Sequence, residues 1–407
     1  MPPDAAAPGP LRSRGSRRSV LAVSTLAMGL GAGPTYLVGY LGAELRADLG
    51  ASGAQLGLLV GLFYGATGLV SLLAAPVVDA LGARRCVVGD QVLVTACLVA
   101  AAATGSLAVL AMASALAGAG YAFANAGTSM AVTAASPRNE AGAAVAVKTA
   151  GIPAAATVLA LTGPALATAV GWQGVCLLLA GGTALTGAAA FLLLPDTRPQ
   201  RGAGPRTAGP PLPRGFIWVV LAATCFVIGN QPLNSFLVLT LVDGGTSPVT
   251  AGLVSAVGTG TGAVAMVLAA RRGDRSGPGR RAATAAGVGT AIVTGTVLLW
   301  TGTHVGLPLV VAGAVLGLVG AMVGAGFSHA VAVDRAPLSV GRATAVMSCG
   351  YYLGALVAPL LFGALADRTG DYDASWAVTV GAAALSVTFF VVVQLRVRPP
   401  AAEPVTR

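Results

Sequence analysis

Long apolar runs dominate this chain and leave few folds open to it. A helix needs about 20 apolar residues to cross a hydrocarbon layer roughly 30 Å thick. Backbone polar groups inside such a layer must be satisfied within the structure, so each run of this length predicts a membrane-spanning helix. We recognise twelve runs, at about residues 19–42, 54–76, 86–105, 107–134, 141–165, 174–194, 216–241, 249–270, 283–302, 306–333, 343–365 and 375–395.

Arginine is distributed unevenly between the gaps that separate these runs. Of the 23 arginines, 21 lie in the terminal segments or in alternate gaps, and the complementary gaps hold only Arg46 and Arg368. Cytoplasmic loops of membrane proteins carry the excess of basic residues. The pattern therefore predicts that both termini and the gap at 195–214 are cytoplasmic, whereas the gaps at 44–52 and 243–247 are extracytoplasmic.

Composition excludes several other classes of protein. Charged residues make up 9% of the chain, against about 25% in a soluble domain. The net charge of +10 lies in loops at one face, so anionic lipid headgroups explain it better than nucleic acid. The five cysteines and two histidines show no metal-ligand spacing, and no Gly-x-x-x-x-Gly-Lys loop is present. We expect no metal, no cofactor, no nucleic-acid partner and no enzymatic activity.

The two halves of the chain repeat the same landmarks. Gly31-Ala-Gly-Pro34 recurs as Gly229-Asn-Gln-Pro232, an offset of 198, and Gly163-Pro164 recurs as Ala358-Pro359, an offset of 195. Repeated six-helix halves place a binding site near the midplane between them. The predicted fold is an all-α membrane protein of two pseudo-symmetric six-helix bundles. Its predicted divisions are a tail at 1–18, a bundle at 19–194, a Pro/Gly/Arg-rich linker at 195–214, a bundle at 215–396 and a tail at 397–407.

The segment that follows the second run, Asp79-Ala-Leu-Gly82-Ala-Arg84-Arg85, resembles the signature loop of the major facilitator superfamily. It departs from that pattern at Ala75 and Ala80. A second stretch, from Val147 to Pro153, is similar to prokaryotic members related to cyanate-type permeases. The resemblance covers essentially the whole chain. It implies a monomeric, multi-pass transporter in a bacterial plasma membrane, with a small-molecule substrate, lipids as partners and protons as a candidate coupling ion.

The signature segment and its copy are candidates for a cytoplasmic gate. Glycine supplies a permissive backbone for a tight turn, and a carboxylate at such a turn can meet helix N-termini or a neighbouring arginine. The arginines also have a simpler explanation as topology signals, but an acidic residue contributes little to orientation. The predicted gating residues are Asp79, Gly82, Arg84, Arg85, Asp274 and Arg275.

Lys148 is the only lysine in the chain and falls about seven residues inside the fifth run. An ionisable residue at that depth is a candidate functional residue, and it could attract an anionic substrate. The alternative is that its stem returns the ammonium to the interface by snorkelling. The sequence favours neither explanation over the other.

Uncharged polar residues supply the remaining candidates for substrate binding. Three amides surround Pro232 in the seventh run, and a proline inside a span exposes backbone carbonyls that need a protein or water partner. A single amide in a membrane helix more often joins helices, but three within five residues favour a cavity wall. With Lys148, the predicted binding residues are Asn230, Gln231, Asn234, Asn125, Tyr36, Tyr121, Tyr351 and Tyr352.

Three functions are consistent with these features. The first is secondary active transport of a small organic solute, with an anion as one candidate, by alternating access. The second is efflux of a drug or secondary metabolite, although Gly163-Pro164 is followed by Ala-Leu-Ala-Thr rather than a glycine-rich antiporter motif. The third is a non-transporting membrane sensor or scaffold. No Asp or Glu lies at the centre of a run, and the Met112–Gly120 stretch lacks the arginine of many proton-coupled relatives.

Overall fold

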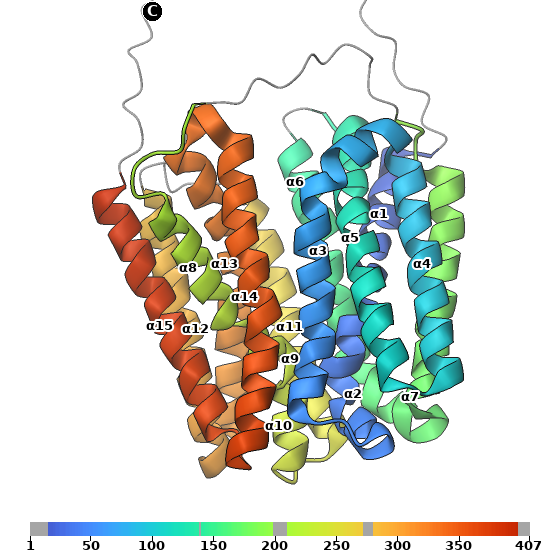
Figure 1. The fold of residues 1–407 in the computed structure, drawn as a ribbon, viewed down its shortest axis with the longest axis vertical. Helices are drawn as coiled ribbons and strands as arrows, with labels where there is room; N and C mark the ends of the chain where they lie inside the picture. Colours follow the sequence, from blue (N-terminus) through green and yellow to red (C-terminus); the bar gives the residue numbers. More distant parts are fainter. Residues whose placement is uncertain (1–14, 138–139, 198–209, 272–279, 398–407) are drawn as a thin grey trace, which may run out of the picture.

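The computed structural model describes residues 15–137, 140–197, 210–271 and 280–397. These residues form an elongated bundle of helices, with no β-strand in the part described (Figure 1). The helices are α1 (Arg17–Gly31), α2 (Gly33–Leu49), α3 (Gly53–Leu81), α4 (Ala83–Thr104), α5 (Leu107–Ala135), α6 (Ala141–Thr149), α7 (Gly151–Leu193), α8 (Ile217–Ile228), α9 (Gln231–Ser235), α10 (Leu237–Asp243), α11 (Pro248–Arg271), α12 (Arg281–Val305), α13 (Leu307–Arg335), α14 (Val340–Thr369) and α15 (Asp373–Arg396), with a 3₁₀ turn η2 (Pro337–Ser339).

The chain crosses the bundle twelve times, as the sequence predicts. Within the described residues, ten helices are long and apolar enough to span a membrane, or eleven when the bent pair α1 and α2 counts as one span. The 53-residue stretch Ala141–Leu193 counts as a single helix there, but at 1.5 Å per residue it would be about 80 Å long. Gly171 breaks it, with φ 69° and ψ 167°, in the left-handed region that favours glycine. The chain reverses there and makes two crossings.

Contacts at both ends of α6 and α7 establish this reversal. At one face of the bundle, Arg17 pairs with Glu140, and Arg84 Nε donates to the carbonyl oxygen of Leu194 at 2.8 Å. At the opposite face, Trp172 Nε1 donates to Asp48 Oδ2 at 2.7 Å. We call the first the linker face, since α7 ends and α8 begins there, and the second the far face. In Figure 1 the linker face is at the top.

Two spans are broken near their middles. The helices α1 and α2 meet at Ala32, two residues before Pro34, with a 45° bend. The seventh span consists of α8, α9 and α10, with breaks at Asn230 and Phe236 around Pro232. These breaks fall at the repeated Gly-x-x-Pro landmarks, because proline removes a backbone donor and clashes with the preceding turn.

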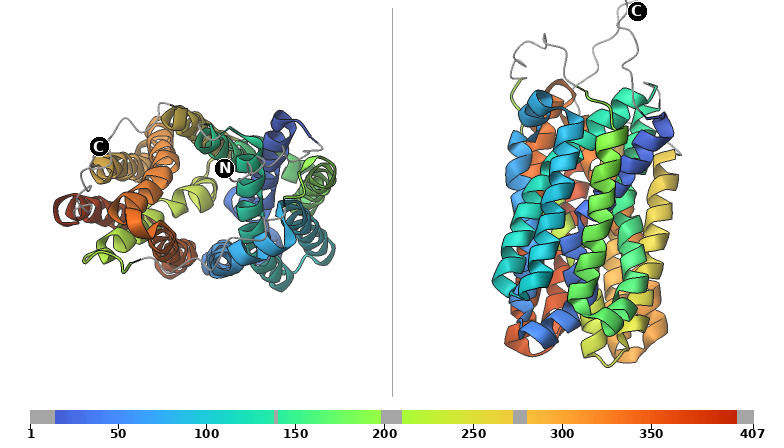
Figure 2. Two further views of the ribbon diagram at one scale, coloured as in Figure 1. Left: turned by 90° about the horizontal axis from the view of Figure 1, so that it is seen from above. Right: turned by 90° about the vertical axis from the view of Figure 1, so that its right-hand side faces the viewer.

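The halves α1–α7 and α8–α15 lie side by side (Figure 2) and meet mainly through α3 with α14 and α7 with α11. Glycine permits a close approach between α3 and α14. A Cβ on Gly57 would lie 2.1 Å from the carbonyl oxygen of Pro359, and one on Gly363 would lie 2.0 Å from that of Gly53. Membrane helices associate through such small-residue contacts, since lipid provides no hydrophobic drive between them. The residue boundaries of the two bundles and the linker remain a prediction.

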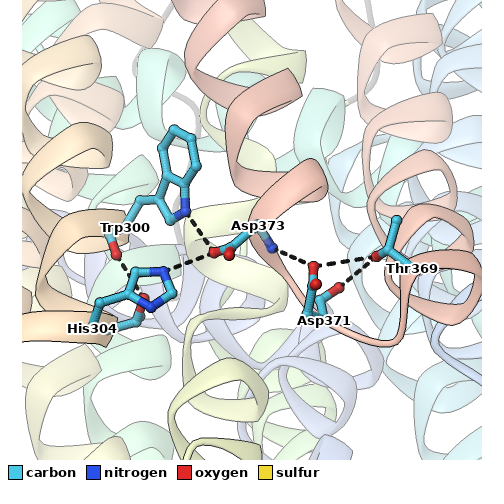
Figure 3. Close-up of polar contacts among 6 residues, drawn as sticks. Trp300, His304, Thr369, Asp371 and Asp373 are labelled. Carbon is cyan, nitrogen blue, oxygen red and sulfur yellow. Dashed lines mark hydrogen bonds and ion pairs between the residues drawn. The ribbon is translucent and has the colours of Figure 1, made fainter.

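A polar cluster ties α12 to α15 at the far face (Figure 3). Asp373 Oδ1 accepts a hydrogen bond from Trp300 Nε1 at 2.7 Å and lies 2.9 Å from His304 Nε2. Asp371 Oδ1 accepts from the backbone N–H of Asp373 at 3.0 Å, which satisfies one of the free amides at the start of α15. The cluster fixes the end of α12 against the start of α15 within the second half.

Candidate functional site

A cavity of about 730 Å³ lies between the two halves, within the usual size range of small-molecule sites. It starts near the middle of the bundle, at the helix breaks beside Ala32 and Asn230. It extends to Val145, close to the start of α6, and to Ala269, close to the end of α11. Both of those positions are on the linker side, so the cavity runs from the midplane toward the linker face.

Aromatic side chains form much of the cavity wall. In the first half, the rings of Phe63 and Tyr121 have centroids 5.3 Å apart. In the second half, Tyr351 lies 5.7 Å from Tyr352 and 5.8 Å from His329. Such rings offer flat apolar faces together with hydroxyl groups at their edges. The aromatic residues of the wall are Tyr36, Tyr40, Phe63, Tyr64, Tyr121, Phe327, Tyr351 and Tyr352.

Side-chain amides at the broken seventh span complete the wall. Asn230 Nδ2 donates to the carbonyl oxygen of Phe226 at 2.5 Å, and Gln231 Nε2 donates to Ser235 Oγ at 3.4 Å. Asn234 also lines the cavity. The amide carbonyls at this break can accept hydrogen bonds from a bound molecule. Among the described residues of the wall there is no Asp, Glu, Lys or Arg, and His329 is the one basic side chain.

Lys148 does not line this cavity, and it does not snorkel. Its side chain is 1% exposed, and its ammonium donates to Asn125 Oδ1 at 2.8 Å, Ser129 Oγ at 2.9 Å and the Asn125 carbonyl at 3.2 Å. An ammonium group has three donors, and these contacts use all of them. The lysine therefore holds α6 to α5 from behind the wall and orients Asn125, which does line the cavity. Neither a cavity-facing position nor snorkelling is seen in this structure, because α5 offers a closer polar partner; the predicted binding role of Lys148 remains a prediction.

The far end of the cavity is closed by polar contacts between the halves. Arg46 Nη1 of α2 lies 2.6 Å from Asp243 Oδ2 of α10, and Tyr372 donates to the same oxygen at 2.6 Å. Asp367 of α14 accepts from the backbone N–H groups of Gly53 at 2.7 Å and Ala54 at 2.8 Å. Those amides begin α3, so the carboxylate neutralises free donors at a helix N-terminus.

Comparison with known proteins identifies the family. The profile described as Major Facilitator Superfamily matches residues 21–242 and 219–407, which is most of the chain. The chain belongs to the major facilitator superfamily. No curated protein sequence matches it.

A solved structure gives the same answer for the fold. A superfamily transporter, FucP, in the outward conformation has a TM-score of 0.63 to this chain at 12% identity, and the match covers 92% of this chain and 99% of the other. Identity this low shows the shared fold alone. Together with the family profile, it makes this protein a secondary membrane transporter rather than an enzyme.

The predicted signature loop of this superfamily member is shorter than expected. Asp79 lies in the last turn of α3, which continues to Leu81, so Gly82 alone joins α3 to α4. Gly82 has φ 87°, and a Cβ there would lie 2.9 Å from the Thr197 carbonyl. Asp79 and Arg85 are exposed, while Arg84 reaches the end of α7. Asp274 and Arg275 lie outside the described residues, and the gating role of the whole set remains a prediction.

The structure brings the other predicted binding residues together on the cavity wall. Asn125, Asn230, Gln231 and Asn234 lie there with Tyr36, Tyr121, Tyr351 and Tyr352, although binding itself remains a prediction. Sequence reasoning missed the aromatic residues Tyr40, Phe63, Tyr64 and Phe327. Tyr40 follows Tyr36 by one helical turn, a spacing that puts both on one face. The others carry no such signal, because a lone aromatic in a span more often packs against a neighbouring helix.

Proposed function

We propose that this protein moves a small, uncharged organic solute that carries an aromatic or other flat ring. The observation that supports this most is the cavity wall, where rings and amides meet without a carboxylate or an arginine. A charged solute would leave water for a wall whose described residues include no carboxylate, lysine or arginine and only His329 as a basic group, and burying an unpaired charge costs several kcal/mol or more. A flat ring with hydrogen-bonding groups would find stacking faces and amide carbonyls instead.

An anionic solute is a weaker candidate than the sequence suggests. The charge expected to attract it is that of Lys148, whose three donors are already used within the protein. Efflux of an amphipathic drug or secondary metabolite is the second candidate, since the same aromatic wall suits such molecules. A sensor role has no support of its own in this cavity. The similarity of residues 147–153 to cyanate-type permeases remains a prediction.

We further propose that transport follows alternating access about this cavity. Contacts at Arg46 and Asp367 hold the far end closed, while wall residues continue toward the linker face. Deeper in the bundle the halves are joined by Thr157 Oγ1, which donates to Thr259 Oγ1 at 3.0 Å, and by hydrogen bonds of the hydroxyl groups of Tyr40, Tyr64 and Tyr352 with Ser255, Gln231 and Ser71. The other state would break the far-face contacts and bring the Asp79 segment against the second half.

The arginine distribution orients this cycle. With 21 of 23 arginines at the linker face or in the termini by the predicted segmentation, the linker face would be cytoplasmic and the far face extracytoplasmic. The cavity would then be open to the cytoplasm, in a bacterial plasma membrane with both termini inside. We expect the unit to be a monomer, since the cavity lies between two halves of one chain.

A transport screen tests the proposal. The purified protein would be reconstituted into vesicles and offered a panel of uncharged ring-bearing solutes, matched carboxylates and matched amines, with and without a proton gradient. We expect saturable uptake of uncharged members and none of the carboxylates. Uptake confined to carboxylates would contradict the solute class, and no uptake across a broad panel would contradict transport.

A further inference from the structure

A buried carboxylate without a charged partner lies behind the cavity wall. Asp90 is the eighth residue of α4 and is 2% exposed. Its Oδ2 accepts one hydrogen bond, from Gln91 Nε2 at 2.9 Å. Its Oδ1 has no hydrogen-bond partner among the described residues. An isolated ionised carboxylate in such surroundings is far more costly than a neutral acid, so this environment favours the protonated form.

No basic side chain compensates Asp90 in this conformation. The helices packed against α4 are α1, α3, α5 and α7. Of these, α3, α5 and α7 contain no Lys, Arg or His, and α1 has only Arg17 and Arg18 at its start. Those two lie about 20 Å along the helix from Gly31, the residue of α1 next to Asp90. On α4 itself, Arg84 bonds to the carbonyl of Leu194 and Arg85 is exposed.

The other titratable groups near Asp90 are neutral at physiological pH. Tyr121 on α5 and Cys97 on α4 interact electrostatically with its carboxylate. The remaining titratable groups are Cys86 on α4, Tyr64 and Asp79 on α3 and Cys176 on α7, and no hydrogen bond or ion pair joins any of them to Asp90 among the described residues. An ordinary phenol or thiol does not titrate below about pH 8, so these neighbours offer no positive charge to hold Asp90 ionised.

The position of Asp90 links it to the part of the cavity wall that bends. A Cβ on Gly31 would lie 3.2 Å from Asp90 Oδ2, and one on Gly120 would lie 2.8 Å from Oδ1. The carboxyl is therefore held between the last residue of α1 and the residue before Tyr121. Ala32, where α1 and α2 bend, and Tyr121 both line the cavity. The acid therefore lies against the chain neighbours of two residues of the cavity wall.

Gln91 connects the charge on Asp90 to the broken span. Its Nε2 donates both to Asp90 Oδ2 and, at 3.3 Å, to the carbonyl oxygen of Ala27 on α1, while its Oε1 has no partner among the described residues. A protonated Asp90 can accept from this amide through its carbonyl oxygen, as here, and can also donate to the Gln91 carbonyl after an amide flip, whereas an ionised Asp90 can only accept. Gain or loss of the proton thereby changes the contact with α1 one turn before its bend.

We propose that Asp90 is the proton-binding site that couples solute transport to a proton gradient. The inference rests on the proposed transport function. In the conformation seen here the acid holds its proton. When α1 and α5 separate at Gly31 and Gly120 during the cycle, water in the cavity reaches the carboxyl and accepts the proton. The proton then binds behind the same cavity wall that contacts the solute. The bend between α1 and α2 responds to both.

Infrared spectroscopy tests the buried acid without any substrate. At about pH 7 a water-exposed carboxyl, with a pKa of about 4, is ionised. We expect the purified wild type in lipid to keep a protonated-carboxyl carbonyl band at this pH, and Asp90→Asn to lose it. The matched control Asp196→Asn, at an exposed position, should keep the band. No band in the wild type, or an unchanged band in Asp90→Asn, would overturn the inference. If the amide variant does not fold, Asp90→Glu should shift the wild-type band.

Transport with a solute found in the vesicle screen tests the coupling. Asp90→Asn mimics the protonated state, so we expect it to exchange internal for external solute while losing accumulation driven by a proton gradient. Asp196→Asn should do both. Accumulation by Asp90→Asn at the wild-type ratio would refute the role of Asp90. Absence of wild-type transport would instead contradict the proposed function, and the infrared result would still decide the state of Asp90.

Discussion

Substitution of Gly57 is the most direct way to perturb the closed far face. It lies on α3 against α14, where a Cβ would be 2.1 Å from the Pro359 carbonyl oxygen and 2.5 Å from its carbon. Ordinary van der Waals contact begins at 3.4 Å, and both obstructing atoms are backbone. Gly57→Leu therefore cannot be accommodated by turning a side chain. We predict that it favours the state in which α3 and α14 separate and the far face opens.

The size of this shift follows from the cost of overpacking. Forcing extra carbons into a close-packed contact costs about 1–3 kcal/mol, which corresponds to a change of about 5- to 150-fold in the ratio of the two states. Leu239 reports on that ratio, because it is 1% exposed on α10 and faces Gly42 of α2 at the far end. The measurement is the rate at which a maleimide labels Leu239→Cys, in purified protein lacking the five native cysteines.

Gly381 supplies the matched control for this experiment. It lies within α15, and nothing is within 4 Å of a Cβ built on it. In the Leu239→Cys background, Gly381→Leu should leave the labelling rate at the parent value, while Gly57→Leu should raise it about 5-fold or more. Equal rates in Gly57→Leu and the parent, with both proteins folded, would refute the claim that this contact belongs to one state of a two-state cycle.

Three further predictions concern the gate, the lysine and the topology. Asp79→Asn should reduce transport while leaving membrane insertion intact, since it weakens charge-assisted contacts of the opposite state; full transport by a normally expressed variant would refute the gate. Lys148→Met should raise KM for an uncharged solute about two- to tenfold. The reason is that the lysine orients Asn125 through hydrogen bonds worth about 0.5–1.5 kcal/mol. Complete loss of transport would favour an anionic substrate instead. An impermeant maleimide should label Ser247→Cys in intact cells but not Gly204→Cys. The reverse labelling pattern would show that the predicted membrane orientation is wrong.

Most of the fold could be predicted from the lengths of the apolar runs and from the landmarks that recur in both halves. Each run predicts a span, and the repeated Gly-x-x-Pro landmarks coincide with the two spans that the structure breaks at Ala32 and Asn230. Helix ends were less predictable: the apolar run ends near Pro76, but α3 continues past this proline through Asp79 to Leu81 and ends at Gly82. The runs at 141–165 and 174–194 predict a reversal between them, but they do not identify Gly171 as the residue where it occurs, since glycine is common throughout the chain.

The site was less predictable than the fold because it depends on which way side chains point. The amides around Pro232 were identified from their density at a repeat break, and they do line the cavity. Lys148 was placed inside a span, but its contacts with Asn125 and Ser129 could not be predicted, since they depend on how α5 packs against α6. Asp90 lies near a predicted span end in the sequence, and only the packing of Gly31 and Gly120 shows that it is sealed from water.

The central claim is that solute passes through the cavity between the two halves, and filling that cavity tests it most directly. Gly326 lines the cavity, and nothing lies within 4 Å of a Cβ built there, so Gly326→Trp can enter the open space without disturbing backbone. Gly381→Trp carries the same side chain on α15, away from the cavity wall. Initial transport rates in vesicles, normalised to protein, should be lost in Gly326→Trp and unchanged in Gly381→Trp. Wild-type transport by the Gly326→Trp protein would contradict the account.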